Sequence, residues 1–69
     1  MEYPIGTELY WRDEKEKGVI TDYRCLAWHS GRLLESYDIT WESGMQAGYH
    51  THFIKLQCDI LSQPETEKE

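Results

Sequence analysis

Two histidines one residue apart, His50 and His52, have the clearest metal-binding spacing in this chain. In a strand, residues i and i+2 point to the same face and lie about 7 Å apart along the chain, which suits two ligands of one metal ion. A structural zinc site needs four ligands, and the remaining candidates are His29, Cys25 and Cys58, without a Cys-x-x-Cys motif. We therefore expect a pair of exposed strand histidines that titrate near neutrality, and no bound metal.

The serines and carboxylates show no catalytic pattern. There is no Gly-x-Ser-x-Gly motif and no phosphate-binding glycine loop. Glu35 and Asp38 fall on opposite faces of the strand expected there, so they do not converge. A fold this small also has no cleft of the usual ligand-pocket volume. We expect a protein that is not an enzyme and has no cofactor.

Aromatic rings are the third group with chemical potential. The chain contains three Trp, five Tyr and one Phe, and such rings favour protein interfaces and attract cations through their faces. Trp11 and Trp41 share strand parity with apolar neighbours, so we assign both to the core. The candidate binding residues are Tyr10, Trp28, Arg32, Tyr37, Met45 and Tyr49.

The stretch 37–44 is the strongest structural pattern, and the other elements are arranged around it. Aromatic or apolar residues alternate with polar ones up to Trp41 and Glu42, which is typical of a half-buried strand. Ser43 and Gly44 then form a turn, because glycine accepts the positive φ that tight turns need.

The rest of the chain reads as further short strands separated by turn residues. We expect strands at 7–11, 19–28, 33–42, 49–53 and 56–60, with a bulge near 22–24 and a 3₁₀ turn at 53–55. Short strands at this spacing predict an all-β fold, and in so short a chain a small five-stranded barrel. Its domain spans residues 1–61, and the polar, acidic tail 62–69 is expected to be disordered.

Strand parity also assigns several side chains to the core. Ile5, Leu9 and Trp11 share the parity that we expect to face inward, so that Tyr10 faces outward. Cys25 and Cys58 stand among apolar residues and are expected to be small core residues.

The charge balance argues against nucleic acid as a direct partner. Asp and Glu number 13 against 7 for Lys and Arg, a net charge of −6. The basic residues of the charged loop 12–17 alternate with acids, whereas phosphate binding needs clustered Lys and Arg. An acidic surface that occupies the basic site of a nucleic-acid-binding protein is an alternative, with candidate residues Glu14, Glu16, Asp22, Glu35, Asp38 and Glu42.

The N-terminus has neither a basic segment nor an apolar segment of the secretory type, and no apolar run approaches membrane-spanning length. We expect a cytoplasmic protein that does not enter membranes. Both cysteines are then reduced.

Three short segments carry a resemblance to a known family. Gly18-Val19-Ile20, the stretch 37–44 and His52-Phe53-Ile54-Lys55-Leu56 resemble the second strand, the third strand with its turn, and the entry to the last strand of SH3-like barrels of the Tudor-like and chromo-barrel type. The likeness spans about Ile5 to Leu61 and implies a five-stranded SH3-like barrel with a 3₁₀ turn before the last strand. It also implies an aromatic cage for methylated Lys or Arg, whose candidate rings are Tyr10, Trp11, Trp28, Tyr37, Trp41 and Tyr49.

The sequence therefore favours a non-catalytic module that binds a protein or peptide through aromatic-lined loops. The acidic decoy is the alternative function. A homo-oligomer that forms through an exposed strand edge is a third expectation.

Overall fold

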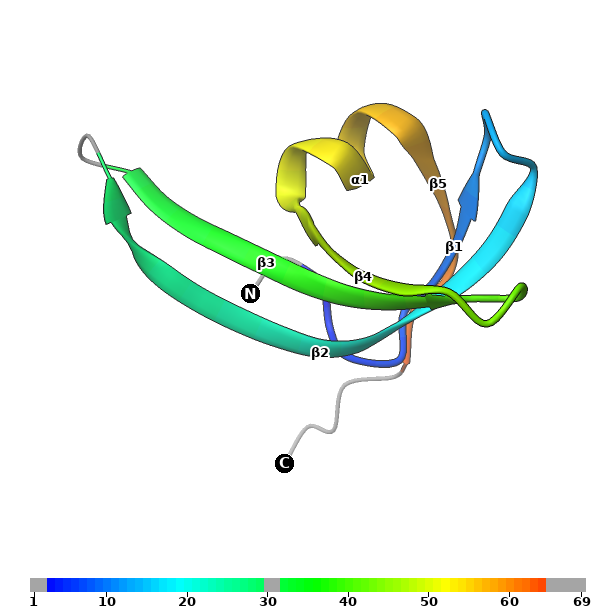
Figure 1. Cartoon of the computed structure of the whole chain (residues 1–69), viewed down its shortest axis with the longest axis horizontal. Helices are drawn as coiled ribbons and strands as arrows, with labels where there is room; N and C mark the ends of the chain where they lie inside the picture. The colour runs from blue at the N-terminus through cyan, green and yellow to red at the C-terminus, as the bar shows by residue number, and fades with distance from the viewer. Residues whose placement is uncertain (1–2, 30–31, 65–69) are drawn as a thin grey trace.

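The computed structural model describes residues 3–29 and 32–64, and for residues 26–29 and 32–34 it describes the backbone alone. The predicted disordered tail 62–69 is described only to Pro64. Its first residue, Ser62, pairs with Glu8 at the end of the last strand, and residues 65–69 lie outside the described residues. The elements in chain order are β1 (Glu8–Trp11), β2 (Glu16–His29), β3 (Arg32–Trp41), β4 (Gln46–His50), α1 (Thr51–Gln57) and β5 (Cys58–Ser62) (Figure 1). The predicted all-β class is confirmed, because strands make up most of the described chain.

The five strands form one antiparallel sheet in the order β4-β3-β2-β1-β5. The first four strands are joined as a meander, and β5 returns to pair with β1 on the far side. The sheet is not closed, because β4 and β5 form its two opposite edges in the part of the chain that is described. The five antiparallel strands are thus as predicted, whereas closure into a barrel is not shown.

Strand β2 is long and curved, and it pairs with both β1 and β3 (Figure 1). Its register with β3 shifts between Ile20 and Asp22 and again between Cys25 and Ala27. The first shift lies at the border of the bulge predicted near residues 22–24. Such shifts add twist and bend to a strand, which lets β2 follow β1 at one end and extend with β3 as a two-stranded hairpin at the other.

The core lies on one face of the sheet, beneath α1. Its buried members are Leu9, Ile20, Tyr37, Ile39, Trp41, Ile54 and Cys58. Parity therefore placed Leu9, Trp41 and Cys58 correctly, and Trp11 packs against the core while partly exposed. Two core assignments are wrong: Ile5 precedes β1 and is 49% exposed, and Cys25 is exposed on the β2–β3 hairpin beyond β1.

The segment before the last strand is the main correction. A seven-residue α-helix, Thr51–Gln57, replaces the predicted 3₁₀ turn, and β4 ends at His50 instead of reaching residue 53. The adjacent apolar residues Phe53 and Ile54 do not fit strand alternation because both pack inward from a helix. Cys58 closes the helix, since its backbone N–H donates to the carbonyl of Ile54.

Arg12, in the turn after β1, ties this helix and β5 to the rest of the sheet. Its guanidinium lies 2.6 Å from a carboxylate oxygen of Asp59 and also donates to the backbone carbonyl of Leu56. Its backbone N–H donates to the carbonyl of Gln57 at 3.2 Å. Within the described residues, no helix has the length and apolar character needed to cross a membrane.

Candidate functional site: the aromatic surface

Four rings from four different elements meet at one end of the core. Trp11 of β1, Trp41 of β3, Tyr49 of β4 and Phe53 of α1 form this group, which we call the aromatic surface. The ring centroids of Trp11 lie 5.1 Å from those of both Trp41 and Phe53. Tyr49 and Phe53 stack at 4.4 Å, and Tyr49 meets Trp41 edge to face at 5.8 Å. These separations are those of attractive ring pairs.

The strand register explains how the rings come together. Gly18 of β2 stands between Leu9 and Trp41 as cross-strand partner of both, and its lack of a side chain leaves room for the Trp41 indole. Tyr49 pairs with the buried Tyr37, so both side chains lie on the core face. Phe53 follows four residues after Tyr49, which lets the first turn of α1 fold its ring onto the tyrosine.

One hydrogen bond fixes the centre of the aromatic surface. The indole Nε1 of buried Trp41 donates to the hydroxyl of Tyr49 at 3.0 Å. The indole Nε1 of Trp11 is also buried, and it has no hydrogen-bond partner among the described residues. Because an indole nitrogen only donates, this group needs an acceptor that the described residues do not supply.

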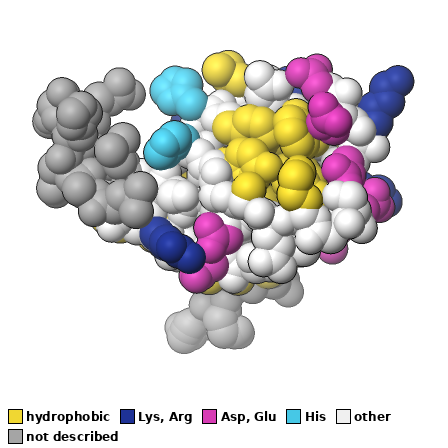
Figure 2. Space-filling model, in the orientation of Figure 1, with side chains coloured by type: hydrophobic (Ala, Val, Ile, Leu, Met, Phe, Trp, Pro, Cys, Tyr) yellow, Lys and Arg dark blue, Asp and Glu magenta, His cyan; other side chains and the backbone are white. Residues whose placement is uncertain are grey.

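Three of the four rings, those of Trp11, Tyr49 and Phe53, are partly exposed, whereas Trp41 is 2% exposed and forms the floor. Figure 2 shows hydrophobic side chains gathered on the face that α1 borders in Figure 1, with acidic side chains along one margin and histidines near another. Exposed contiguous apolar surface with a polar border is typical of an interaction site. Ring faces of this kind accept apolar groups and cations.

The structure distributes the predicted binding residues over several places. Tyr49 belongs to the aromatic surface, and Met45 is 48% exposed in the turn that leads into β4. Tyr10 is half-buried and points to the opposite face, as the neighbour of inward-facing Leu9. The side chains of Trp28 and Arg32 lie outside the described residues.

Tyr37 is a correction, because it is fully buried and cannot line an exposed loop. Its ring packs between Tyr3 at 5.6 Å and Tyr23 at 5.2 Å. Phe53 was missed as a site residue. The two adjacent apolar residues at 53 and 54 were the available signal, since they mark the point where the strand pattern ends.

A hydrogen-bond network centred on Glu35 connects the start of α1 to β3. The Glu35 carboxylate accepts hydrogen bonds from the hydroxyls of Tyr37 at 3.1 Å and Thr51 at 3.3 Å. A ring nitrogen of His50 lies 3.1 Å from the Glu35 backbone carbonyl. Burial, followed by the hydrogen bond with Glu35, raises the pKa of Tyr23. We read this network as structural, because it joins the start of α1 to the β2–β3 hairpin.

The prediction that His50 and His52 lie on one strand is wrong. His50 ends β4 and His52 lies in α1, and both are exposed. No group of three or more His, Cys, Asp or Glu side chains able to hold a metal ion occurs in the described part of the chain. Burial raises the pKa of the Cys58 thiol to about 11, because apolar surroundings disfavour the charged thiolate.

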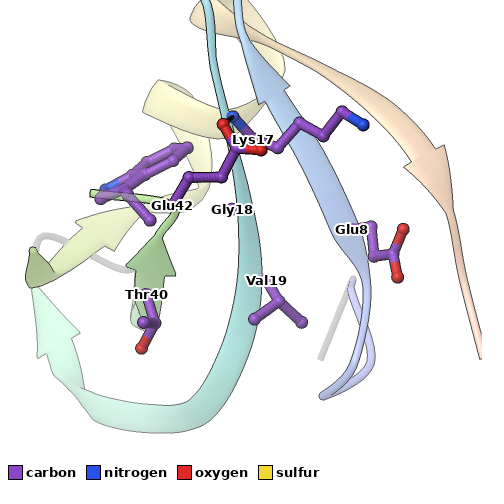
Figure 3. A pocket seen from close by; sticks show the side chains of 7 residues that line it. Glu8, Lys17, Gly18, Val19, Thr40 and Glu42 are labelled. Atoms are coloured by element: carbon purple, nitrogen blue, oxygen red, sulfur yellow. Dashed lines mark hydrogen bonds between the residues drawn. The ribbon is translucent and has the colours of Figure 1, made fainter. Parts of the chain in front are cut away.

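A shallow groove lies elsewhere, around the start of β2. Its volume is about 360 Å³, and it is lined by Glu8, Lys17, Gly18, Val19, Thr40, Trp41 and Glu42. Figure 3 shows Lys17 and Glu42 together at one end, above Val19 and Thr40. A carboxylate oxygen of Glu42 accepts from the Lys17 backbone N–H at 3.4 Å, so the acid is engaged in joining two strands.

Comparison with known proteins gives no relative to argue from. No protein-family model matches the chain, and neither the curated proteins nor the solved structures contain a significant match.

Proposed function

We propose that this chain is a non-catalytic interaction module that binds a protein or peptide segment through the aromatic surface. The observation that carries the proposal is the convergence of Trp11, Tyr49 and Phe53, all partly exposed, over the buried ring of Trp41. Large rigid rings give contact area at a low cost in side-chain entropy, which is why they concentrate in binding sites. Met45 extends the apolar area of the molecule at the turn before β4.

The architecture supports an SH3-like barrel as the scaffold. A strand order with β5 paired to β1, and a short helix directly before β5, match the connectivity that the sequence resemblance implies. The helix takes the place expected for the 3₁₀ turn. In this arrangement the meander and α1 together present the aromatic surface at one end of the sheet.

A cationic or apolar segment is the chemistry that suits this surface. Ring faces attract Lys and Arg side chains, and the chain carries a net charge of −6 that favours basic partners. Nucleic acid suits it less, because the cations that the structure describes include Arg12 and Arg24, which are already paired with Asp59 and Asp38.

The acidic decoy remains the alternative proposal. Most of its candidate acids accept hydrogen bonds within the fold, namely Glu16, Asp22, Glu35, Asp38 and Glu42. These contacts leave fewer free carboxylates for a basic site on a partner, and they favour the aromatic surface as the place of contact.

Affinity capture from native extract at low and high ionic strength separates the two proposals. The bait is the wild-type chain, compared with Phe53→Ser on the aromatic surface and with Thr40→Ser on the opposite face as control. We expect a partner that survives high salt and is lost with Phe53→Ser alone. A partner that is lost in high salt and retained by Phe53→Ser would support the decoy instead.

A further inference from the structure

The two edges of the sheet differ in how they are protected. On β5 the register with β1 shifts between Glu8 and Leu9, which leaves Leu61 as an extra residue between Ile60 and Ser62. Asp59 adds a charge that is paired with Arg12. A bulge and a charge are the usual means by which proteins prevent an edge strand from pairing with another chain.

Strand β4 has neither protection. Its sequence, Gln46-Ala47-Gly48-Tyr49-His50, contains no Lys, Arg, Asp, Glu or Pro, although charged residues make up 29% of the chain. All five residues pair with β3 in unbroken register, and all but Tyr49 are exposed. An uncharged, regular and exposed edge of this kind is a template for a further strand.

The hydrogen-bond pattern shows which backbone groups the open edge offers. The N–H of Trp41 donates to the carbonyl of Met45 at 2.9 Å, so Met45 turns its backbone toward β3. Because this direction alternates along an antiparallel strand, Ala47 and Tyr49 also turn toward β3. The N–H and C=O groups of Gln46 and Gly48, and the N–H of His50, therefore point to the open edge.

We infer that β4 pairs with β4 of a second copy of this chain, antiparallel about a two-fold axis at Gly48. This register joins edge-facing residues to edge-facing residues: Gly48 meets its own copy, and Gln46 meets His50 of the second copy. On the core face, this register places the large Tyr49 opposite the small Ala47 of the second copy. On the other face, it places the amide of Gln46 opposite the imidazole of His50. The facing residues include no Asp, Glu, Lys or Arg, so this register avoids the repulsion between carboxylates that a chain of net charge −6 would otherwise risk.

The dimer goes beyond the proposed function and does not depend on it. Tyr49 stands on β4 itself, so pairing would bring the aromatic surfaces of the two copies to the same side of one continuous sheet. Five residue pairs make a short interface, and we expect a weak dimer whose population rises with protein concentration.

Sedimentation of the full chain from micromolar to millimolar concentration tests the inference. We expect the mass to rise toward twice the 8.2 kDa of one chain. The double variant Gln46→Lys/His50→Lys sets like charges opposite each other and should weaken dimerisation by about tenfold or more, as should Gln46→Glu/His50→Glu. Mixing the lysine and glutamate variants should restore a mixed dimer.

Ser62→Lys on the β5 edge is the matched control and should dimerise like the wild type. Circular dichroism establishes that each variant is folded. A single-chain mass at every concentration would overturn the inference. So would a dimer that persists in both β4 variants, or one that only Ser62→Lys disrupts.

Discussion

The indole of Trp41 lies directly against the backbone of Gly18, its cross-strand partner in β2. A Cβ atom placed at Gly18 would stand 2.4 Å from Cε3 of Trp41 and 2.9 Å from Cγ2 of Ile39. Both distances are shorter than any normal contact between carbon atoms, so the glycine is required by packing. The close packing of Trp41 on Gly18 fixes the position of the buried indole against which other rings of the aromatic surface pack.

Gly18→Ala should therefore destabilise the fold by about 1–3 kcal/mol, the usual cost of forcing an extra methyl group into a packed core. Denaturant unfolding measures the loss. Val19→Ala, on the opposite face and half-buried, is the control and should cost less. Equal or higher stability of Gly18→Ala would show that the indole does not occupy this position.

Tyr49→Phe removes the acceptor for the Trp41 indole N–H and retains the stacked ring. Because Trp41 is 2% exposed, its N–H would be left buried without this partner, at a cost of about 1–3 kcal/mol. Thermal or urea unfolding checks the value. Tyr10→Phe, on the opposite face, should change stability little, and equal effects of the two variants would argue against the hydrogen bond.

Glu35→Ala should loosen the start of α1, because it removes the carboxylate that accepts from the hydroxyls of Tyr37 and Thr51. The buried Tyr37 hydroxyl then loses an acceptor, and we expect a loss of about 1–3 kcal/mol. Amide hydrogen exchange in α1 should accelerate relative to β1. Glu14→Ala, in the exposed turn after β1, is the control, and unchanged exchange in Glu35→Ala would contradict the structural role.

Alkaline pH should destabilise the protein through Cys58. Its folded-state pKa is raised from 9.0 to about 11, so the unfolded chain loses this proton first as the pH rises. The contribution to stability is therefore intact below pH 9 and declines between pH 9 and pH 11. Tyr23, whose pKa burial also raises above 10.0, adds to the loss at the upper end.

Urea unfolding at a series of pH values from 8 upward, about one unit apart, measures this dependence. Cys58→Ala is expected to be less stable overall but to show a shallower decline over the same range. The exposed Cys25 should react with a thiol reagent at pH 8 well before Cys58 does. Rapid reaction of both thiols in the folded protein would contradict the burial of Cys58.

Alternation along strands predicted much of the fold. The pattern at Ile39 and Trp41 gave the buried face of β3 correctly, and Leu9 gave that of β1. The same pattern put Tyr37 on the buried face, so its selection as a binding residue conflicted with its own parity. Cys25 was misplaced because it lies where the β2–β3 hairpin extends beyond β1. It pairs with Glu35 and shares the face of Tyr37 and Tyr23, but β1 does not reach that part of the hairpin and the residue is exposed.

Alternation along strands could not predict α1 or the aromatic surface. Seven residues make about two turns, too short for a helical period to stand out against a strand pattern. Without the helix, Phe53 had no assigned face, and its stacking on Tyr49 depends on the turn that α1 makes after His50. The aromatic surface joins four elements, so only the assembled sheet brings its rings together.

Chemical-shift mapping with a peptide from the captured partner tests the central claim most directly. If the aromatic surface is the binding site, the amide and ring resonances of Trp11, Tyr49 and Phe53 should shift together on titration. Those of Val19, Thr21 and Thr40, on the opposite face, should stay in place. Shifts that concentrate on the opposite face, or that spread evenly over the sheet, would contradict the assignment of the aromatic surface as the site.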